Sequence, residues 1–234
     1  MADLLVLWDV DYTLLSADGL GNRLYEAVFK DLFGRDLTAI APKAGRTDRA
    51  ILLDTLALAG VAEPQAHVDD FLAALARQVA AVDGTMNARV HPLAGASAAI
   101  AALAMASTPH RQIHQSVLTG NMRPLAVLKL AAADLGDHLD LGAGAYGDAH
   151  EVRAELVSVA RLAARRLYGA DFAGSATILI GDTPLDVEAA LATGARVVGV
   201  ATGGYSTTEL AEAGAHAVLP DLTDPALVVA AVTG

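Results

Sequence analysis

Short apolar runs that end in polar residues alternate with helical patterns along most of this chain, and this alternation constrains the fold most. The clearest run, Leu4–Trp8, ends at Asp9, and another, residues 176–180, ends at Gly181 and Asp182. Unbroken apolar runs of this length are typical of strands buried on both faces of a parallel sheet. Residues 113–118, which three polar residues interrupt, and the short runs at 197–200 and 217–219 are further strand candidates.

Helical patterns fill the stretches between several of these runs. Apolar spacing predicts helices over residues 124–135, 155–168 and 184–193. Strands that alternate with helices indicate βαβ units, so we expect an α/β protein with a doubly wound, Rossmann-like parallel sheet. Such sheets bind ligands at the carboxyl ends of their strands, where the sequence places Asp9, Asp182 and the polar residues after 118.

One long segment lacks strand patterns and is expected to form an inserted α-helical cap. Asp18 can cap a first helix that stops at Gly34, and two more helices are expected over residues 47–59 and 68–82. We therefore predict two units. The core comprises residues 1–16 and 92–234, and the cap comprises residues 17–91.

Composition and charge exclude several classes of function. The 234 residues are 54% hydrophobic, carry a formal net charge of −11 and include no cysteine. An acidic protein is a poor partner for nucleic acid or an anionic membrane, and disulfides and thiolate metal sites are impossible without cysteine. A small phosphate ester remains a suitable ligand because a metal ion or helix N-termini can supply local positive charge. With no signal peptide or membrane-spanning pattern, we expect a cytoplasmic protein; the sequence carries no signal for an oligomeric state.

Four carboxylates follow two of the predicted strands. Asp9 and Asp11, two residues apart, point the same way if the strand geometry continues. One of them could attack phosphorus while the other transfers a proton. Asp182 and Asp186 add two more carboxylates, and such a set of hard oxygen ligands suits Mg²⁺. The alternative for each pair is an Asp-rich turn or an acidic helix start.

A third polar motif, Thr119-Gly120-Asn121, follows the run at residues 113–118. A hydroxyl group and free backbone N–H groups at a helix start can hold phosphate oxygens, although a plain helix cap is the alternative. Each motif alone is weak evidence. Their order along the chain, each at the end of a predicted parallel strand, is more specific.

Together these motifs resemble the haloacid dehalogenase superfamily of aspartate-nucleophile hydrolases, and the helical insert resembles that superfamily's C1 cap. The resemblance implies that Asp9 is the nucleophile and forms an aspartyl-phosphate, and that Asp11 is the acid and base. It implies a Mg²⁺ ion bound by Asp9, the backbone carbonyl of Asp11 and Asp182, with Asp186 at or beside the ion.

The resemblance also assigns the phosphoryl group to Thr119 and the backbone of Gly120 and Asn121. Members of the superfamily have a basic residue between the second and last motifs, usually a lysine followed by proline. This chain lacks that pair. Arg153 and Lys129 are the candidates, and we favour Arg153 because it precedes a predicted helix.

Two other positions bear on the substrate. Tyr12 stands where relatives often have glycine, so it is expected to flank the pocket or pack under the cap. Arg46 lies at the start of the second cap helix and could pair with an anionic substrate. Simple helix capping by Thr47 or Asp48 is the alternative for that loop.

The sequence thus predicts a Mg²⁺-dependent phosphomonoester hydrolase acting on a small phosphorylated metabolite. The pattern is most similar to phosphoglycolate-phosphatase-like enzymes. The alternatives are a phosphosugar mutase or a 2-haloacid dehalogenase of the same fold, or a non-catalytic receiver or binding module. Asp11 argues against a dehalogenase, which needs no acid for an alcohol leaving group, and the helical cap argues against a receiver.

Overall fold

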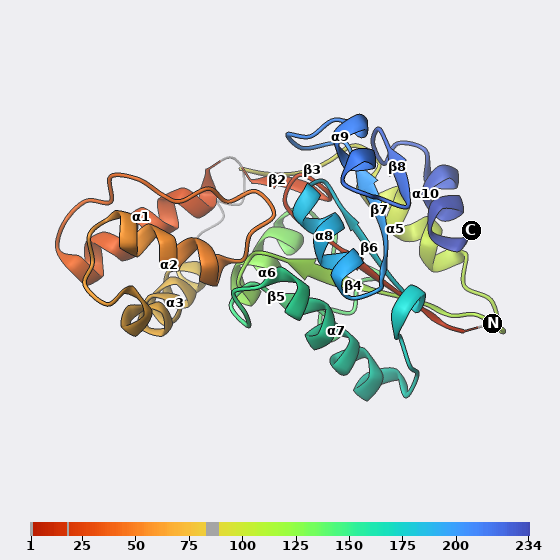
Figure 1. Cartoon of the computed structure of the whole chain (residues 1–234), viewed down its shortest axis with the longest axis horizontal. Helices are drawn as coiled ribbons and strands as arrows, with labels where there is room; N and C mark the ends of the chain where they lie inside the picture. Colours follow the sequence, from red (N-terminus) through yellow and green to blue (C-terminus); the bar gives the residue numbers. More distant parts are fainter. Residues whose placement is uncertain (1, 18, 83–88) are drawn as a thin grey trace.

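A six-stranded parallel sheet forms the core of the protein (Figure 1). The computed structural model describes residues 2–17, 19–82 and 89–234. The strand order is β5-β4-β1-β6-β7-β8, with β1 paired to β4 on one side and β6 on the other. The strands are β1 (Leu4–Trp8), β4 (Ile113–Thr119), β5 (Ala145–Tyr146), β6 (Thr177–Gly181), β7 (Arg196–Val200) and β8 (Ala217–Leu219). This arrangement confirms the predicted α/β fold.

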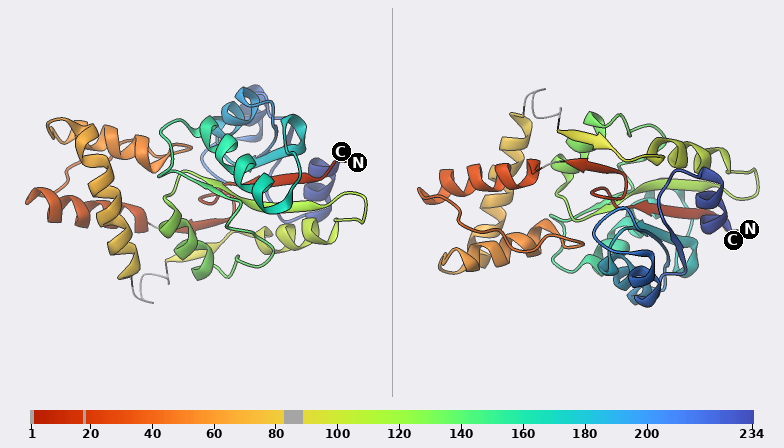
Figure 2. Two further views of the ribbon diagram at one scale, coloured as in Figure 1. Left: turned by 90° about the horizontal axis from the view of Figure 1, so that it is seen from below. Right: turned by 90° about the horizontal axis from the view of Figure 1, so that it is seen from above.

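Helices cover both faces of the sheet, as Figure 2 shows from below and above. The face reached by Val6 and Trp8 packs on α5 (Ala96–Met105), α6 (Arg123–Ala132) and α10 (Pro225–Thr233). The face reached by Leu5 and Leu7 packs on α7 (Arg153–Tyr168), α8 (Pro184–Ala192) and α9 (Thr207–Glu212). Because alternate side chains of a strand point to opposite faces, the unbroken apolar run of β1 supplies both halves of the core.

Among the described residues, three helices form an insert beside the carboxyl ends of the strands, at the left of Figure 1. They are α1 (Leu20–Phe33), α2 (Asp48–Leu58) and α3 (Pro64–Ala80). α1 ends as predicted at Gly34, whose φ of 67° is a left-handed conformation that glycine adopts without strain. Tyr25 and Phe71 pack against each other inside the insert. The proposed cap at Asp18 lies outside the described residues.

A two-stranded antiparallel ribbon joins the insert to the core. It pairs β2 (Leu15–Ala17) with β3 (Val90–Pro92). No strand was predicted in either place, because three residues are too few to set a pattern and the partners lie far apart in sequence.

Several other elements differ from the prediction. α3 begins at Pro64 rather than at residue 68, and α6 ends at Ala132 rather than at 135. No helix or strand was predicted at α5, α9, α10 or β5. α5 and α10 are so uniformly apolar that no periodicity marks them, and β5 has only two residues. No helix in the described part of the chain has the length and hydropathy to cross a membrane.

Candidate active site

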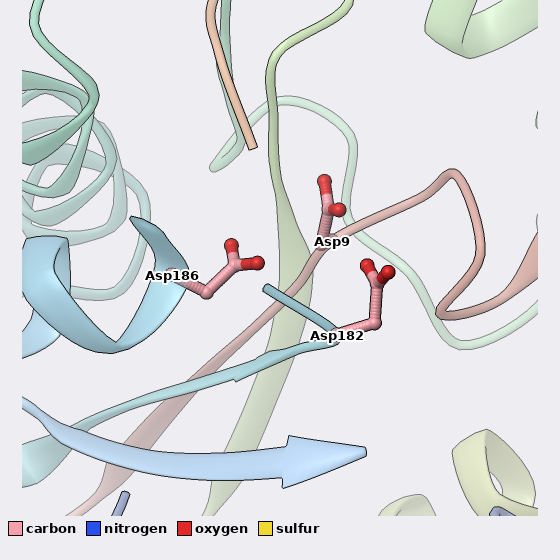
Figure 3. A group of neighbouring side chains, drawn as sticks. All are labelled: Asp9, Asp182 and Asp186. Atoms are coloured by element: carbon pink, nitrogen blue, oxygen red, sulfur yellow. The ribbon is translucent and has the colours of Figure 1, made fainter. Parts of the chain in front are cut away.

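Three carboxylates meet at the carboxyl ends of β1 and β6, as Figure 3 shows. Trp8 and Ile180 are partners in the neighbouring strands, so Asp9 and Asp182, which follow these strands, emerge at the same edge. Asp186 joins them from the first turn of α8. Each of the three carboxylates offers an oxygen within 4.8 Å of the others, and all three residues are buried.

The electrostatics of this cluster favour a bound cation. Burial raises the pKa of Asp9 to about 7, although Arg153 opposes the shift. Burial and the charge of Asp9 raise the pKa of Asp182 to about 8. Buried carboxylates are costly unless they are paired or bind a metal ion, and three oxygen donors of this kind suit Mg²⁺. The cluster can therefore hold a divalent metal ion.

Arg153, the first residue of α7, lies between two of these carboxylates. Its Nη2 atom is 3.0 Å from an oxygen of Asp9 and 2.5 Å from an oxygen of Asp186. Its guanidinium also donates to the backbone carbonyls of Gly45 and Leu118, both at 3.3 Å. Burial lowers the pKa of Arg153, but Asp186 and Asp9 outweigh this and raise it above its ordinary value. Arg153 thus stays charged and supplies one of the positive charges that the cluster needs.

Lys129 contacts the other carboxylate of the first motif. Its Nζ atom donates to both oxygens of Asp11, at 2.8 and 2.7 Å, and to Oδ1 of Asn121 at 2.8 Å. The Asn121 amide donates to Asp11 as well, at 2.6 Å. Both oxygens of Asp11 are held in this way, and its carboxylate is not part of the three-carboxylate cluster. The two basic candidates therefore serve different carboxylates: Arg153 contacts Asp9, and Lys129 contacts Asp11.

The third motif lies beside these groups, after β4. The buried Thr119 hydroxyl accepts hydrogen bonds from the backbone and side-chain nitrogens of Asn121, at 3.2 and 2.9 Å. Gly120 is pressed against the backbone carbonyl of Arg46, where a Cβ atom would overlap it. Only glycine permits this close approach of a cap loop to the core.

The N-terminus of α2 docks on this part of the core. The buried Asp48 carboxylate accepts from the Met122 backbone N–H at 2.7 Å and from the Tyr25 hydroxyl at 2.9 Å. The Asp48 backbone N–H donates to Gly120 at 2.6 Å. Thr47 is the N-cap of α2, so the capping alternative for this loop is realised. These bonds hold the helical insert closed over the strand ends.

A cavity of about 610 Å³ lies between the insert and the core. Its core wall excludes Asp186 but includes the other predicted site residues of the core: Asp9, Asp11, Thr119, Gly120, Asn121, Lys129, Arg153 and Asp182. Its insert wall includes Asn22, Lys43 and Arg46. Tyr12 also lines the cavity and is 57% exposed, as expected for a residue at its mouth.

A family profile described as haloacid dehalogenase-like hydrolase matches residues 6–191. The chain belongs to this family. The match spans the three strand-end motifs and the helical insert, which agrees with the predicted resemblance.

Solved structures of several other proteins have the same fold. A hydrolase from Pseudomonas syringae is 21% identical, with a TM-score of 0.62 and 95% of both chains covered. A predicted phosphatase from Clostridium acetobutylicum is 18% identical, with a TM-score of 0.64 and 94% of both chains covered. A third structure, a HAD family hydrolase from Deinococcus radiodurans with bound phosphate and sodium, is 24% identical. It has a TM-score of 0.52 and covers 99% of this chain and 95% of its own. No curated protein sequence matches the chain.

Three further residues of this family member, which were not predicted from the sequence, lie at the site. The Thr13 hydroxyl donates to Asp182 at 3.2 Å. Gly203 lies against Asp182 so closely that a Cβ atom would overlap the carboxylate. Lys43 enters the cavity from the loop before α2. Nothing in the sequence marks Thr13 or Lys43 beyond their proximity to motif residues.

The raised pKa values of Asp9 and Asp182 predict how stability depends on pH in this haloacid dehalogenase-like protein. Unfolded aspartates release their protons near pH 4, whereas the folded chain keeps these two to about pH 7 and 8. Between these limits the folded state binds more protons, so the free energy of unfolding should fall as the pH rises. Urea unfolding in EDTA should show a less stable protein at about pH 8 than at about pH 5.5.

An Asp182→Asn variant is the control, because it removes one of the two shifted groups. Its free energy of unfolding should depend less on pH than that of the wild type. If the free energy of unfolding of this variant depends on pH as strongly as that of the wild type, Asp182 does not cause the pH dependence.

Proposed function

We propose that the protein is a Mg²⁺-dependent phosphomonoester hydrolase that acts through an aspartyl-phosphate on Asp9. The observation that carries the proposal is the convergence of Asp9 with Asp182 and Arg153, while Asp11 faces the same cavity. Transfer of a phosphoryl group needs in-line positioning and neutralisation of charge more than covalent help from many groups. The likeness to a predicted phosphatase and to a structure that binds phosphate agrees with this chemistry.

The proposed reaction has two steps. A carboxylate oxygen of Asp9 attacks phosphorus, the bond from phosphorus to the ester oxygen breaks, and Asp11 gives its proton to the leaving alcohol. Asp11 then takes a proton from a water molecule as that water attacks phosphorus, which releases phosphate and restores Asp9. When bound, Mg²⁺ neutralises charge on the phosphoryl oxygens.

The contacts support a role for each site residue. Asp9, the backbone carbonyl of Asp11 and Asp182 would hold the metal ion. Asp186 would act mainly through Arg153, because its oxygens are occupied by that guanidinium and by Thr183.

The remaining roles concern the phosphoryl group and Asp11. Arg153 would neutralise Asp9 and the phosphoryl group, and Lys129 would orient Asp11. Thr119 with the backbone of Gly120 and Asn121 would hold the phosphoryl oxygens.

We further propose that residues 1–16 and 92–234 act as the catalytic core and residues 17–91 as a C1-type cap. The β2–β3 ribbon at the two crossings supports this division. A cap that closes over the site must open to exchange substrate and product, and such a ribbon is a suitable hinge. A small phosphoglycolate-like ester is the proposed substrate, because a cavity of about 610 Å³ suits a small molecule.

The activity is tested by phosphate release from p-nitrophenyl phosphate and a panel of small phosphate esters. We expect hydrolysis that requires Mg²⁺ and stops in EDTA. Asp182→Asn should raise the Mg²⁺ concentration needed for half-maximal rate. Equal rates in Mg²⁺ and in EDTA, or no phosphate release from any ester, would contradict the proposal; a mutase or a dehalogenase would give no net phosphate.

A further inference from the structure

The cations that line the cavity differ in their partners. Among the described residues there are four: Lys43, Arg46, Lys129 and Arg153. Arg153 pairs with Asp9 and Asp186, and Lys129 pairs with Asp11. Their positive charges are therefore already matched by the acidic motifs.

Arg46, the residue predicted to pair with an anionic substrate, is also engaged. Its guanidinium lies 2.6 Å from the carboxylate of Asp54 on α2 and donates to the carbonyls of Pro42 and Ala50. These contacts hold Arg46 within the cap. They do not favour the substrate role that its position in the sequence suggested.

Lys43 is different. Within the described residues, its ammonium group lies in no ion pair with a carboxylate. Its single hydrogen bond there goes to Oδ1 of Asn22 on α1, at 2.5 Å. The ammonium also lies 4.8 Å from the centre of the Tyr25 ring, which fixes its place in the cavity wall. Two of its three N–H donors are thus available to a ligand.

The position of Lys43 in the cavity wall suits contact with the leaving group of the substrate. Burial lowers the pKa of Lys43, while Asp48 raises it and Lys129 lowers it further. Lys43 and Asp11 both line this cavity, Lys43 from the insert and Asp11 from the core. Asp11 is the proposed acid for the leaving alcohol. Lys43 is half-buried and forms no ion pair among the described residues, so an anion beside its ammonium would offset the cost of burying this charge.

We infer that Lys43 and Asn22 bind a carboxylate on the leaving group of the substrate. One ammonium and the adjacent amide match the single charge and two oxygens of a carboxylate better than the higher charge of a second phosphate. The substrate class is then a small phosphate ester of a hydroxy acid. The inference rests on the proposed phosphatase function and names the substrate of that same site.

The test uses two phosphonates that cannot be hydrolysed, measured by calorimetry with the full chain in Mg²⁺. One is 3-phosphonopropanoate, which carries a carboxylate, and the other is propylphosphonate, which has a neutral tail. The wild type should prefer the carboxylated ligand. Lys43→Met should weaken its binding roughly 10- to 100-fold and leave propylphosphonate within about twofold, since hydrogen bonds to charged groups have effects of this size.

Three further variants make the result specific. Lys43→Arg should keep most of the preference for the carboxylated ligand. Asn22→Ala should reduce that preference although the positive charge of Lys43 remains. Lys30→Met removes an exposed lysine on α1 and should leave both affinities unchanged. No preference in the wild type, or an equal effect of Lys43→Met on both ligands, would overturn the inference.

The two proposals fail separately. The phosphatase proposal is tested with p-nitrophenyl phosphate, which has no carboxylate. Hydrolysis of that ester without a carboxylate preference in the binding experiment would reject only the role of Lys43. If the protein prefers the carboxylated ligand because of Lys43 but hydrolyses no ester, only the phosphatase proposal is rejected.

Discussion

Asp9→Asn should abolish turnover of phosphate esters while the protein stays folded. Asparagine has the size and shape of aspartate but cannot form the acyl phosphate, and removal of a nucleophile costs on the order of 10⁵-fold in kcat. The fold should tolerate the change because it removes one of three crowded, buried negative charges. The burial that raises the pKa of Asp9 would no longer act against folding at neutral pH.

The measurement is the initial rate of phosphate release at saturating substrate and Mg²⁺, with urea unfolding of the same preparation. Asp36→Asn is the matched control, because the Asp36 side chain is 80% exposed and far in sequence from the motifs. It should keep wild-type turnover. Substantial turnover by folded Asp9→Asn would show that another group attacks phosphorus.

Arg153→Met should destabilise the metal-free protein by about 3–5 kcal/mol, because loss of one partner leaves buried charges without compensation. Arg153 is buried and contacts both Asp9 and Asp186. Methionine fills part of the space but supplies no charge. Mg²⁺ should restore part of the lost stability, since a ligand that binds only the folded state stabilises it.

Urea unfolding with Mg²⁺ and with EDTA measures this effect. Arg165→Met, an exposed arginine in the last turn of the same helix, is the control and should change the free energy of unfolding little. Adding Asp186→Asn to Arg153→Met should recover stability, because it removes one of the stranded charges. A loss of under about 1 kcal/mol in EDTA would contradict the assigned role of Arg153 in the cluster.

The strand-end motifs could be predicted because their signals are local. Apolar runs such as Leu4–Trp8 mark buried parallel strands, and the topology of such a sheet brings their carboxyl ends to one edge. Asp9 and Asp182 therefore lie together without any need to predict how distant segments pack. The fold class followed from the same alternation of strands and helices.

The partners within the site could not be predicted, because they depend on how the insert docks on the core. Asp48 contacts Met122, which is 74 positions away in sequence, and this contact sets where the loop before α2 lies. That loop carries both Arg46 and Lys43, and nothing in the sequence indicates which of the two faces a ligand. The same holds for Lys129, whose position in α6 gave no sign of its bonds to Asp11.

A crystal structure with Mg²⁺ and beryllium trifluoride, a mimic of a phosphoryl group on a carboxylate, tests the central claim most directly. We predict that beryllium binds an oxygen of Asp9, that Mg²⁺ lies between Asp9 and Asp182, and that Thr119 and Arg153 contact the fluorides. Beryllium on a different carboxylate, or a metal ion bound away from Asp182 while Asp9 stays unmodified, would contradict the account.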